Sequence, residues 1–237
     1  MLKIGKTLLN AVPQIALVVS DREPNALLRP LRIDVLEIRI DQFRRYDLDY
    51  IKENVLKRKA LGVPLILTIR NTKKEGGMAH ISDAVKLRIF QTLVPLVDAF
   101  DIELSSPIIF KVIQLARKNK KPIIVSAHNF KNTPSPAALE KIFKAAVQKG
   151  ANIVKIATKA NSLDDVNQLW QFTIKHQKDN VITMSLGKIG SISRLVFPAA
   201  GSLLTYSHVG NPSAPGQLPL GILQGHVRLY YPGYKSR

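Results

Sequence analysis

Hydrophobic residues recur along the chain in short runs that are rich in β-branched side chains. There are eight such runs, and several are apolar almost throughout, as in strands that are covered on both faces. They lie at residues 15–19, 35–40, 65–69, 100–104, 123–125, 153–156, 181–184 and 203–206. Between them, apolar positions follow the helical period instead, as at Val85, Ile89 and Leu93. This alternation predicts strands and helices that follow one another in parallel βαβ units.

Two of the predicted helices carry start or stop signals. One begins at Ser135, an N-cap residue followed by Pro136, and is closed by Gly150. Another begins at Ser162, where Asp165 three residues later completes a capping box. These signals place one helix on each side of the sixth apolar run, as the βαβ pattern requires.

The number of strands and the length of the chain together select the fold. Eight strands with their helices in 237 residues match a (β/α)8 TIM barrel of the α/β class, which uses about 200–250 residues as one domain. The alternative, a doubly wound sheet, normally has a glycine-rich phosphate loop after its first strand, and residues 20–24 contain no glycine. We therefore predict one barrel domain over residues 1–237, with a lid loop at about 208–218.

The charge balance changes the range of partners to consider. Lys and Arg number 35 against 17 Asp and Glu, so the net charge of +18 attracts anions of any kind. Nucleic-acid recognition usually adds a docking motif or stacking aromatic residues, and aromatic residues are only 6% of this chain. The lack of cysteine excludes disulfides and thiol chemistry. No apolar stretch reaches the roughly 20 residues of a membrane span, so we expect a cytoplasmic protein without nucleic-acid or membrane partners.

Ionisable residues concentrate at the carboxyl ends of the predicted strands, where (β/α)8 barrels place their chemistry. They are Glu37, Arg39, Asp41, Arg70, Glu75, Asp101, Glu103, His128, Lys155 and Arg194. Taken singly, an Arg or Glu at a strand end usually forms an ion pair, and a lone His is more often structural than catalytic. We assign Asp41 and Asp101 to such a structural role, as partners that orient arginines or backbone groups.

Lys155 needs a different explanation because it stands inside an apolar run. A lysine inside a barrel is costly unless it is paired or uncharged, and the alternative is a side chain that points outward. If it points inward among Arg39, Arg70 and Arg194, burial and like charges favour the neutral amine. A neutral amine attacks ketones and aldehydes to form an imine. The pattern therefore predicts a Schiff-base enzyme for a small anionic carbonyl compound, with His128 as proton carrier and no metal ion.

Seven short segments carry these polar residues in a characteristic order. They are 36–41 (LEIRID), 68–70 with 75–77 (TIR, EGG), 101–104 (DIEL), 126–130 (SAHNF), 154–157 (VKIA), 187–194 (GKIGSISR) and 213–217 (SAPGQ). Together they resemble the type I 3-dehydroquinate dehydratases over about residues 14–220. The resemblance implies a (β/α)8 barrel, active as a homodimer without a cofactor. It also implies dehydration of 3-dehydroquinate to 3-dehydroshikimate, the third step of the shikimate pathway toward aromatic amino acids.

The resemblance implies catalytic roles for three residues. Lys155 corresponds to the lysine that forms an imine with the substrate ketone at C3. His128 corresponds to the general acid and base that removes the C2 proton and returns a proton to the departing C1 hydroxyl. Glu75 corresponds to a carboxylate that holds and polarises this histidine.

The resemblance also implies a set of substrate-binding residues. Arg194 corresponds to the arginine that pairs with the substrate carboxylate, a task suited to a bidentate guanidinium. Ser213 and Gln217 correspond to the lid that closes over the carboxylate and the C1 hydroxyl. The residues that correspond to the ring-hydroxyl site are Glu37, Arg39 and Arg70.

Two other functions stay open from the residues alone. Another Schiff-base barrel, such as a class I aldolase, would need a phosphate site in the loops after strands seven and eight. This chain has Arg194 and a Pro-Gly-Gln segment there, which suit a carboxylate better. A basic nucleic-acid-binding or scaffold protein would instead bind duplex DNA with a steep salt dependence.

Overall fold

The computed structural model describes residues 2–9, 13–70, 76–77 and 79–234. Eight parallel strands follow one another in chain order, and each of the eight predicted runs matches one of them. They are β3 (Gln14–Val19), β4 (Val35–Arg39), β5 (Leu65–Thr68), β6 (Ala99–Glu103), β7 (Ile123–Asn129), β8 (Ile153–Lys159), β9 (Val181–Leu186) and β10 (Leu204–His208). A ninth strand, β11 (Leu218–Pro219), pairs with the end of β10.

The sheet curls into a barrel. Each strand from β3 to β8 pairs in parallel with the next, and β10 pairs with β3. The ends of the sheet meet where the Leu203 amide, just before β10, donates a hydrogen bond of 2.9 Å to the carbonyl of Val181 at the start of β9. The predicted (β/α)8 barrel is therefore confirmed, and the doubly wound alternative is wrong.

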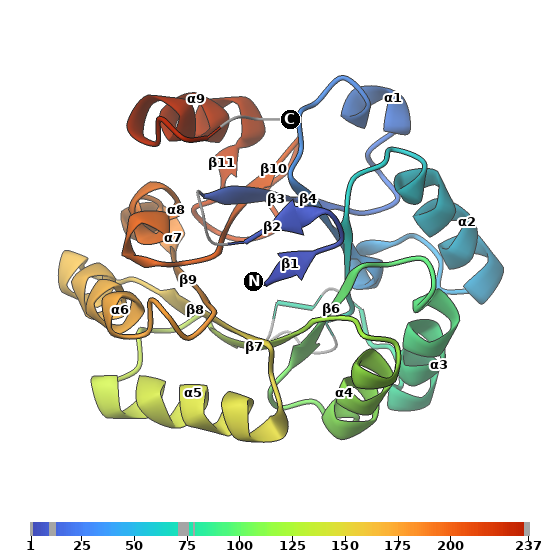
Figure 1. The fold of residues 1–237 in the computed structure, drawn as a ribbon, viewed down its shortest axis with the longest axis horizontal. Helices are drawn as coiled ribbons and strands as arrows, with labels where there is room; N and C mark the ends of the chain where they lie inside the picture. The colour runs from blue at the N-terminus through green and yellow to red at the C-terminus, as the bar shows by residue number, and fades with distance from the viewer. Residues whose placement is uncertain (1, 10–12, 71–75, 78, 235–237) are drawn as a thin grey trace.

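Helices surround the strands on the outside (Figure 1). They are α1 (Asn25–Leu28), η1 (Ile40–Gln42), α2 (Leu48–Lys59), α3 (Asp83–Leu93), α4 (Ile109–Lys118), α5 (Pro136–Lys149), α6 (Leu163–Lys175), α7 (Gly187–Gly190), α8 (Ser193–Val196), η3 (Phe197–Ala200) and α9 (Leu220–Tyr230). Both predicted helix starts are confirmed, because Ser135 caps α5 and Ser162 forms a reciprocal capping box with Asp165 at α6. No helix in the described ranges is long and apolar enough to cross a bilayer.

The amino-terminal end of the barrel is closed by apolar packing. A hairpin of β1 (Lys3–Ile4) and β2 (Thr7–Leu8) lies across the middle of the barrel in Figure 1. Ile4 and Leu9 are fully buried there, in one cluster with the inward-facing residues of the strands. The inward-facing residues nearest this end are Ala16, Val35, Ile66, Ala99, Ile124, Ile153, Ile182 and Leu204. Among the described residues, this packing fills the amino-terminal end of the barrel interior.

Strand alternation decides which way Lys155 points. In β8, Ile153 and Ala157 belong to the interior cluster, whereas Val154 and Ile156 pack outward against the helices. Successive side chains of a strand alternate between its two faces, so Lys155 shares the interior face with Ile153 and Ala157. It is 4% exposed. The outward-pointing alternative is wrong.

Candidate active site

Lys155 lies at the centre of the barrel between two acidic side chains. Its Nζ donates hydrogen bonds to Glu37 Oε2 at 3.0 Å and to Asp101 Oδ2 at 3.1 Å. The same Nζ lies 4.0 Å from the centre of the Tyr206 ring, within the range of a cation–π interaction. The two carboxylates come from β4 and β6, across the barrel from β8.

Asp101 is fixed by a network of buried hydrogen bonds. Arg70 Nη2 donates to its Oδ2 at 2.7 Å, and Ser126 Oγ donates to its Oδ1 at 2.6 Å. Burial alone would raise the pKa of Asp101, but the charges of Arg70 and Lys155 hold it well below its usual range. The predicted structural role as an arginine partner is thus observed, and the contact with Lys155 is an addition that the sequence did not indicate.

His128 ends the inward-facing row of β7 and lines the same pocket as Lys155. Burial, followed by the positive charges of Arg70 and Lys155, lowers its pKa well below the ordinary 6.5. Its imidazole is therefore neutral at pH 7 and keeps one nitrogen that can accept a proton. Phe130 stacks parallel to it, with ring centres 6.2 Å apart. Glu75, which the sequence predicted as the carboxylate beside this histidine, lies outside the described residues.

Arg194 is a buried cation whose hydrogen-bonding capacity is largely unused. The residue follows β9 on α8 and is 1% exposed. Nη1 donates to Met184 Sδ at 2.9 Å, whereas Nε and Nη2 have no hydrogen-bond partner among the described residues. Burial lowers its pKa to about 10 from the ordinary 12.5. A buried guanidinium with unpaired donors is a site for an anion, because an anion would remove the cost of its burial.

A loop of residues 209–217 between β10 and β11 covers one side of the pocket. Gln217 Oε1 accepts hydrogen bonds from the amide and the hydroxyl of Ser213, at 2.7 and 3.1 Å. The Gly187 amide donates to the Pro215 carbonyl at 3.1 Å. Gly216 has φ +79°, and a Cβ added there would lie 2.3 Å from the Gly187 carbonyl oxygen. The position of this loop against the turn after β9 therefore depends on glycine at 216.

Arg39 faces the pocket but is already paired. Its Nε and Nη2 donate to the two carboxylate oxygens of Asp41, at 2.9 and 2.8 Å, and Nη2 also donates to the Gly76 carbonyl at 2.8 Å. Asp41 also accepts the Arg70 amide, so the predicted role of Asp41 in orienting arginine and backbone is observed. Arg39 thereby ties the end of β4 to the loop that follows β5.

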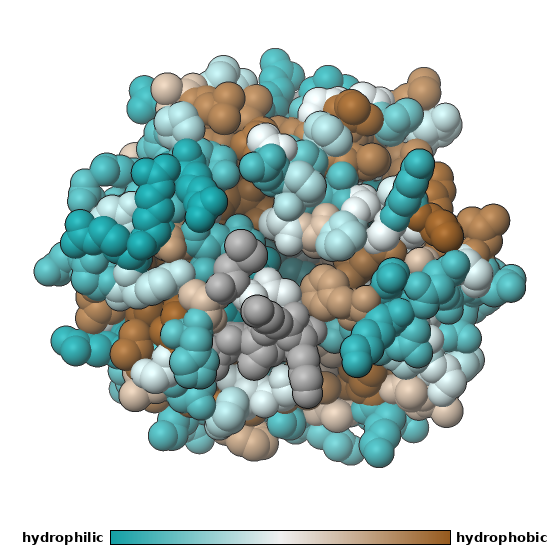
Figure 2. All heavy atoms as spheres, turned by 180° about the vertical axis from the view of Figure 1, so that it is seen from behind, coloured by the Kyte–Doolittle hydropathy of each residue, from teal (hydrophilic) through white to brown (hydrophobic). Residues whose placement is uncertain are grey.

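One pocket collects the predicted site residues. All of those within the described ranges line it: Glu37, Arg39, Arg70, His128, Lys155, Arg194, Ser213 and Gln217. The sequence analysis missed Tyr206, Met184 and Phe130, which line the pocket as well. The signal for Tyr206 was its place two residues after Leu204 in a strand, which puts both on the interior face. The pocket opens on the face of the barrel opposite to the hairpin. The surface of this face is mostly hydrophilic, with apolar patches between the hydrophilic regions (Figure 2).

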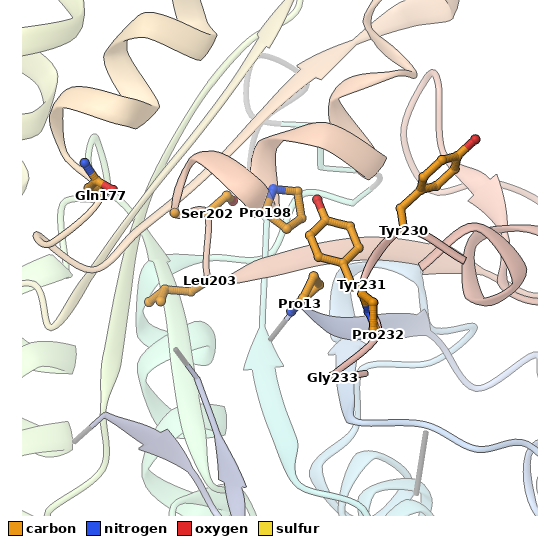
Figure 3. A pocket seen from close by; sticks show the side chains of 10 residues that line it. Pro13, Gln177, Pro198, Ser202, Leu203, Tyr230, Tyr231, Pro232 and Gly233 are labelled. Carbon is orange, nitrogen blue, oxygen red and sulfur yellow. The ribbon is translucent and has the colours of Figure 1, made fainter. Parts of the chain in front are cut away.

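A second hollow lies at the opposite end of the barrel, near the amino ends of β3 and β10 (Figure 3). Prolines and tyrosines dominate its lining, with Tyr231, Pro198 and Pro13 facing one another. Its described lining contains no Lys, Arg, His, Asp or Glu. Its described lining offers no lysine for an imine and no histidine or carboxylate beside one, so the candidate active site is the pocket around Lys155.

Comparison with known proteins gives a consistent result. A family model described as type I 3-dehydroquinase matches residues 18–232. A 3-dehydroquinate dehydratase of Thermodesulfovibrio yellowstonii is 37% identical over 217 residues, covering 90% of this chain and 93% of its own length. One from Hydrogenobaculum is 38% identical over 220 residues, covering 92% and 99%. The crystal structure of the type I enzyme from Clostridium difficile, with covalently modified comenic acid, has a TM-score of 0.88 at 26% identity and covers 98% of each chain.

Proposed function

The chain belongs to the type I 3-dehydroquinase family, and from this premise we propose that it dehydrates 3-dehydroquinate to 3-dehydroshikimate through an imine on Lys155. One observation supports the proposal most strongly. A single pocket holds an inward-pointing lysine, a neutral histidine and a buried arginine with unpaired donors. The lysine can react with the ketone of the substrate, the histidine can take the proton of its acidic C–H bond, and the arginine can bind its carboxylate.

The first step joins the substrate to Lys155. The amine must be neutral to attack C3, and Glu37, which accepts its hydrogen bond at 3.0 Å, is placed to take the proton. The carbinolamine then loses its hydroxyl as water. The proton for this step is the one that Glu37 took from the lysine, passed to the hydroxyl by His128, so a protonated imine remains with Glu37 ionised and His128 neutral again. The ring of Tyr206 and the charges of Glu37 and Asp101 stabilise this cation beside them.

The second step removes the elements of water from the ring. Neutral His128 takes a proton from C2, and the electron pair of the C–H bond becomes the double bond of an enamine, with the imine nitrogen as electron sink. The enamine then expels the C1 hydroxyl, which leaves as water with a proton from His128. A second water hydrolyses the conjugated imine and frees the product and the lysine.

Substrate binding divides between the two sides of the pocket. We assign Arg194 to the carboxylate, because its Nε and Nη2 are unpaired among the described residues. Ser213 and Gln217 would close over the carboxylate and the C1 hydroxyl, with the loop they occupy excluding bulk water while the enamine exists. We assign the ring hydroxyls of the substrate to Glu37, Arg39 and Arg70.

Three further features belong to the same proposal. We expect a homodimer, a cytoplasmic location and a biosynthetic role in the shikimate pathway. Sedimentation of the purified chain tests the first, because a homodimer has twice the 26.3 kDa mass of one chain.

An activity assay tests the function directly. The purified chain is incubated with 3-dehydroquinate, and formation of the conjugated enone product is followed by its ultraviolet absorbance. We expect turnover by the wild type and its loss in Lys155→Ala and His128→Ala. Lys159→Ala is the matched control, since Lys159 is an exposed lysine at the end of the same strand. A folded wild type that leaves 3-dehydroquinate unchanged would contradict the proposal.

A further inference from the structure

Tyr206 stands in the pocket beside the residues that the imine chemistry needs. It lies on β10, is 2% exposed and faces the barrel interior together with Leu204. The face of its ring covers Lys155 Nζ at 4.0 Å. Its side chain therefore borders the position that the substrate carbon bonded to Lys155 would occupy.

The hydroxyl of Tyr206 makes no well-formed hydrogen bond in the described part of the chain. Its oxygen is buried. A buried polar group without a partner costs stability, and phenylalanine would fill the same space without this cost. Burial, followed by the negative charges of Glu37 and Asp101 and by the approach of the Glu37 carboxylate to the hydroxyl, raises the pKa of this phenol well above 10. The group therefore stays protonated and is available as a hydrogen-bond donor.

We infer that Tyr206 is a further substrate-binding residue, whose hydroxyl donates a hydrogen bond to the substrate hydroxyl next to the imine carbon. The inference rests on the proposed function. In 3-dehydroquinate the ketone at C3 has a hydroxyl-bearing neighbour, C4, on the side away from the reacting carbons C2 and C1. Because Arg194 takes the carboxylate on C1 and Lys155 takes C3, the C4 hydroxyl is the substrate oxygen nearest the residues that surround Lys155.

The inference has a thermodynamic signature that a structural tyrosine would not show. A hydrogen-bond donor that lacks a good acceptor in the free protein and gains one in the complex favours substrate binding and destabilises the free protein. Tyr206→Phe should therefore keep or raise the melting temperature while it weakens substrate binding. Tyr234 provides the contrast, because its hydroxyl donates to Asp34 Oδ2 at 3.0 Å at the closed end of the barrel. Tyr234→Phe should lower the melting temperature and leave KM unchanged.

The test measures kcat, KM and melting temperature for the wild type and both variants, with 3-dehydroquinate and with its 4-deoxy analogue. We expect Tyr206→Phe to raise KM for 3-dehydroquinate by about 3- to 10-fold, the worth of one neutral hydrogen bond. With the 4-deoxy analogue, Tyr206→Phe and the wild type should have the same KM, because the proposed contact is missing from both.

Each other result overturns a defined part of the account. An active wild type whose KM is unchanged in Tyr206→Phe overturns this inference alone. A variant that raises KM equally for both substrates overturns the assignment to the C4 hydroxyl. A Tyr206→Phe protein that melts at a lower temperature than the wild type shows a structural hydroxyl and also overturns it. A wild type that does not turn over 3-dehydroquinate overturns the proposed function together with the inference.

Discussion

Replacing Arg194 by methionine removes a charge that the free protein stabilises poorly. The guanidinium is 1% exposed, and its Nε and Nη2 have no hydrogen-bond partner among the described residues. Methionine keeps an unbranched apolar stem in the same space and adds no unpaired donor. We expect Arg194→Met to make the free protein more stable and to abolish its affinity for carboxylates.

The magnitude follows from the effect of burial on the pKa of Arg194. A decrease from the ordinary 12.5 to about 10 corresponds to a cost of about 3 kcal/mol, at about 1.4 kcal/mol for each pKa unit. Because the pKa is lower in the folded state, this cost is complete below about pH 10 and disappears as the pH rises toward 12.5. At neutral pH the variant should gain roughly 1–3 kcal/mol, since some packing of the arginine stem is lost.

Urea unfolding and ligand-induced thermal shifts together measure both effects. Quinate is a suitable ligand because it carries the carboxylate but has no ketone for Lys155 to attack. It should raise the melting temperature of the wild type and leave that of Arg194→Met unchanged. KM for 3-dehydroquinate should rise roughly 100-fold or more in the variant. Arg88→Met, at an exposed arginine on α3, is the control. A variant that is less stable than the wild type and whose melting temperature still rises with quinate would show that Arg194 is not the carboxylate site.

Three other predictions follow from the same pocket. The pKa of His128 lies well below 6.5, so kcat/KM should stay level as the pH falls from 8 to 6.5 and decline at lower pH. His128→Asn should remove the activity at every pH in this range. Asp101→Asn leaves buried cations without their partner and should cost about 3–5 kcal/mol in urea unfolding, unlike a change at an exposed aspartate. Gly216→Ala would push the 209–217 loop away from the Gly187 carbonyl and should lower kcat/KM about tenfold with little change in melting temperature. Gly221→Ala, where a Cβ has open space, should leave both unchanged.

The fold could be predicted because its signal is local. Each apolar run is itself one strand, and the caps at Ser135 and Ser162 mark helix starts within a few residues of the positions they control. The hairpin of residues 3–8 was not predicted. Its two-residue strands are too short to show a period, and their burial depends on the barrel end that they cover.

The sequence was sufficient to predict which residues line the site, but not all the contacts between them. Lys155 lies inside its strand, His128 near the end of its strand, and Arg194 just after β9, and the topology of the barrel brings all three to the same pocket. The contact between Lys155 and Glu37 joins residues 118 positions apart. Its existence depends on the stagger of the closed barrel, which local patterns do not encode. For the same reason the contact between Asp101 and Lys155 was not predicted, and Tyr206 was taken only as part of a strand.

The central claim is that Lys155 forms an imine with the substrate. The protein is incubated with 3-dehydroquinate and reduced with borohydride, whose hydride converts the imine to a stable secondary amine, and peptide mapping then locates the added mass. We expect one adduct, on Lys155, that is absent from Lys155→Ala and unaffected in Lys159→Ala. A folded, active protein that gives no adduct, or an adduct on another lysine, would contradict it.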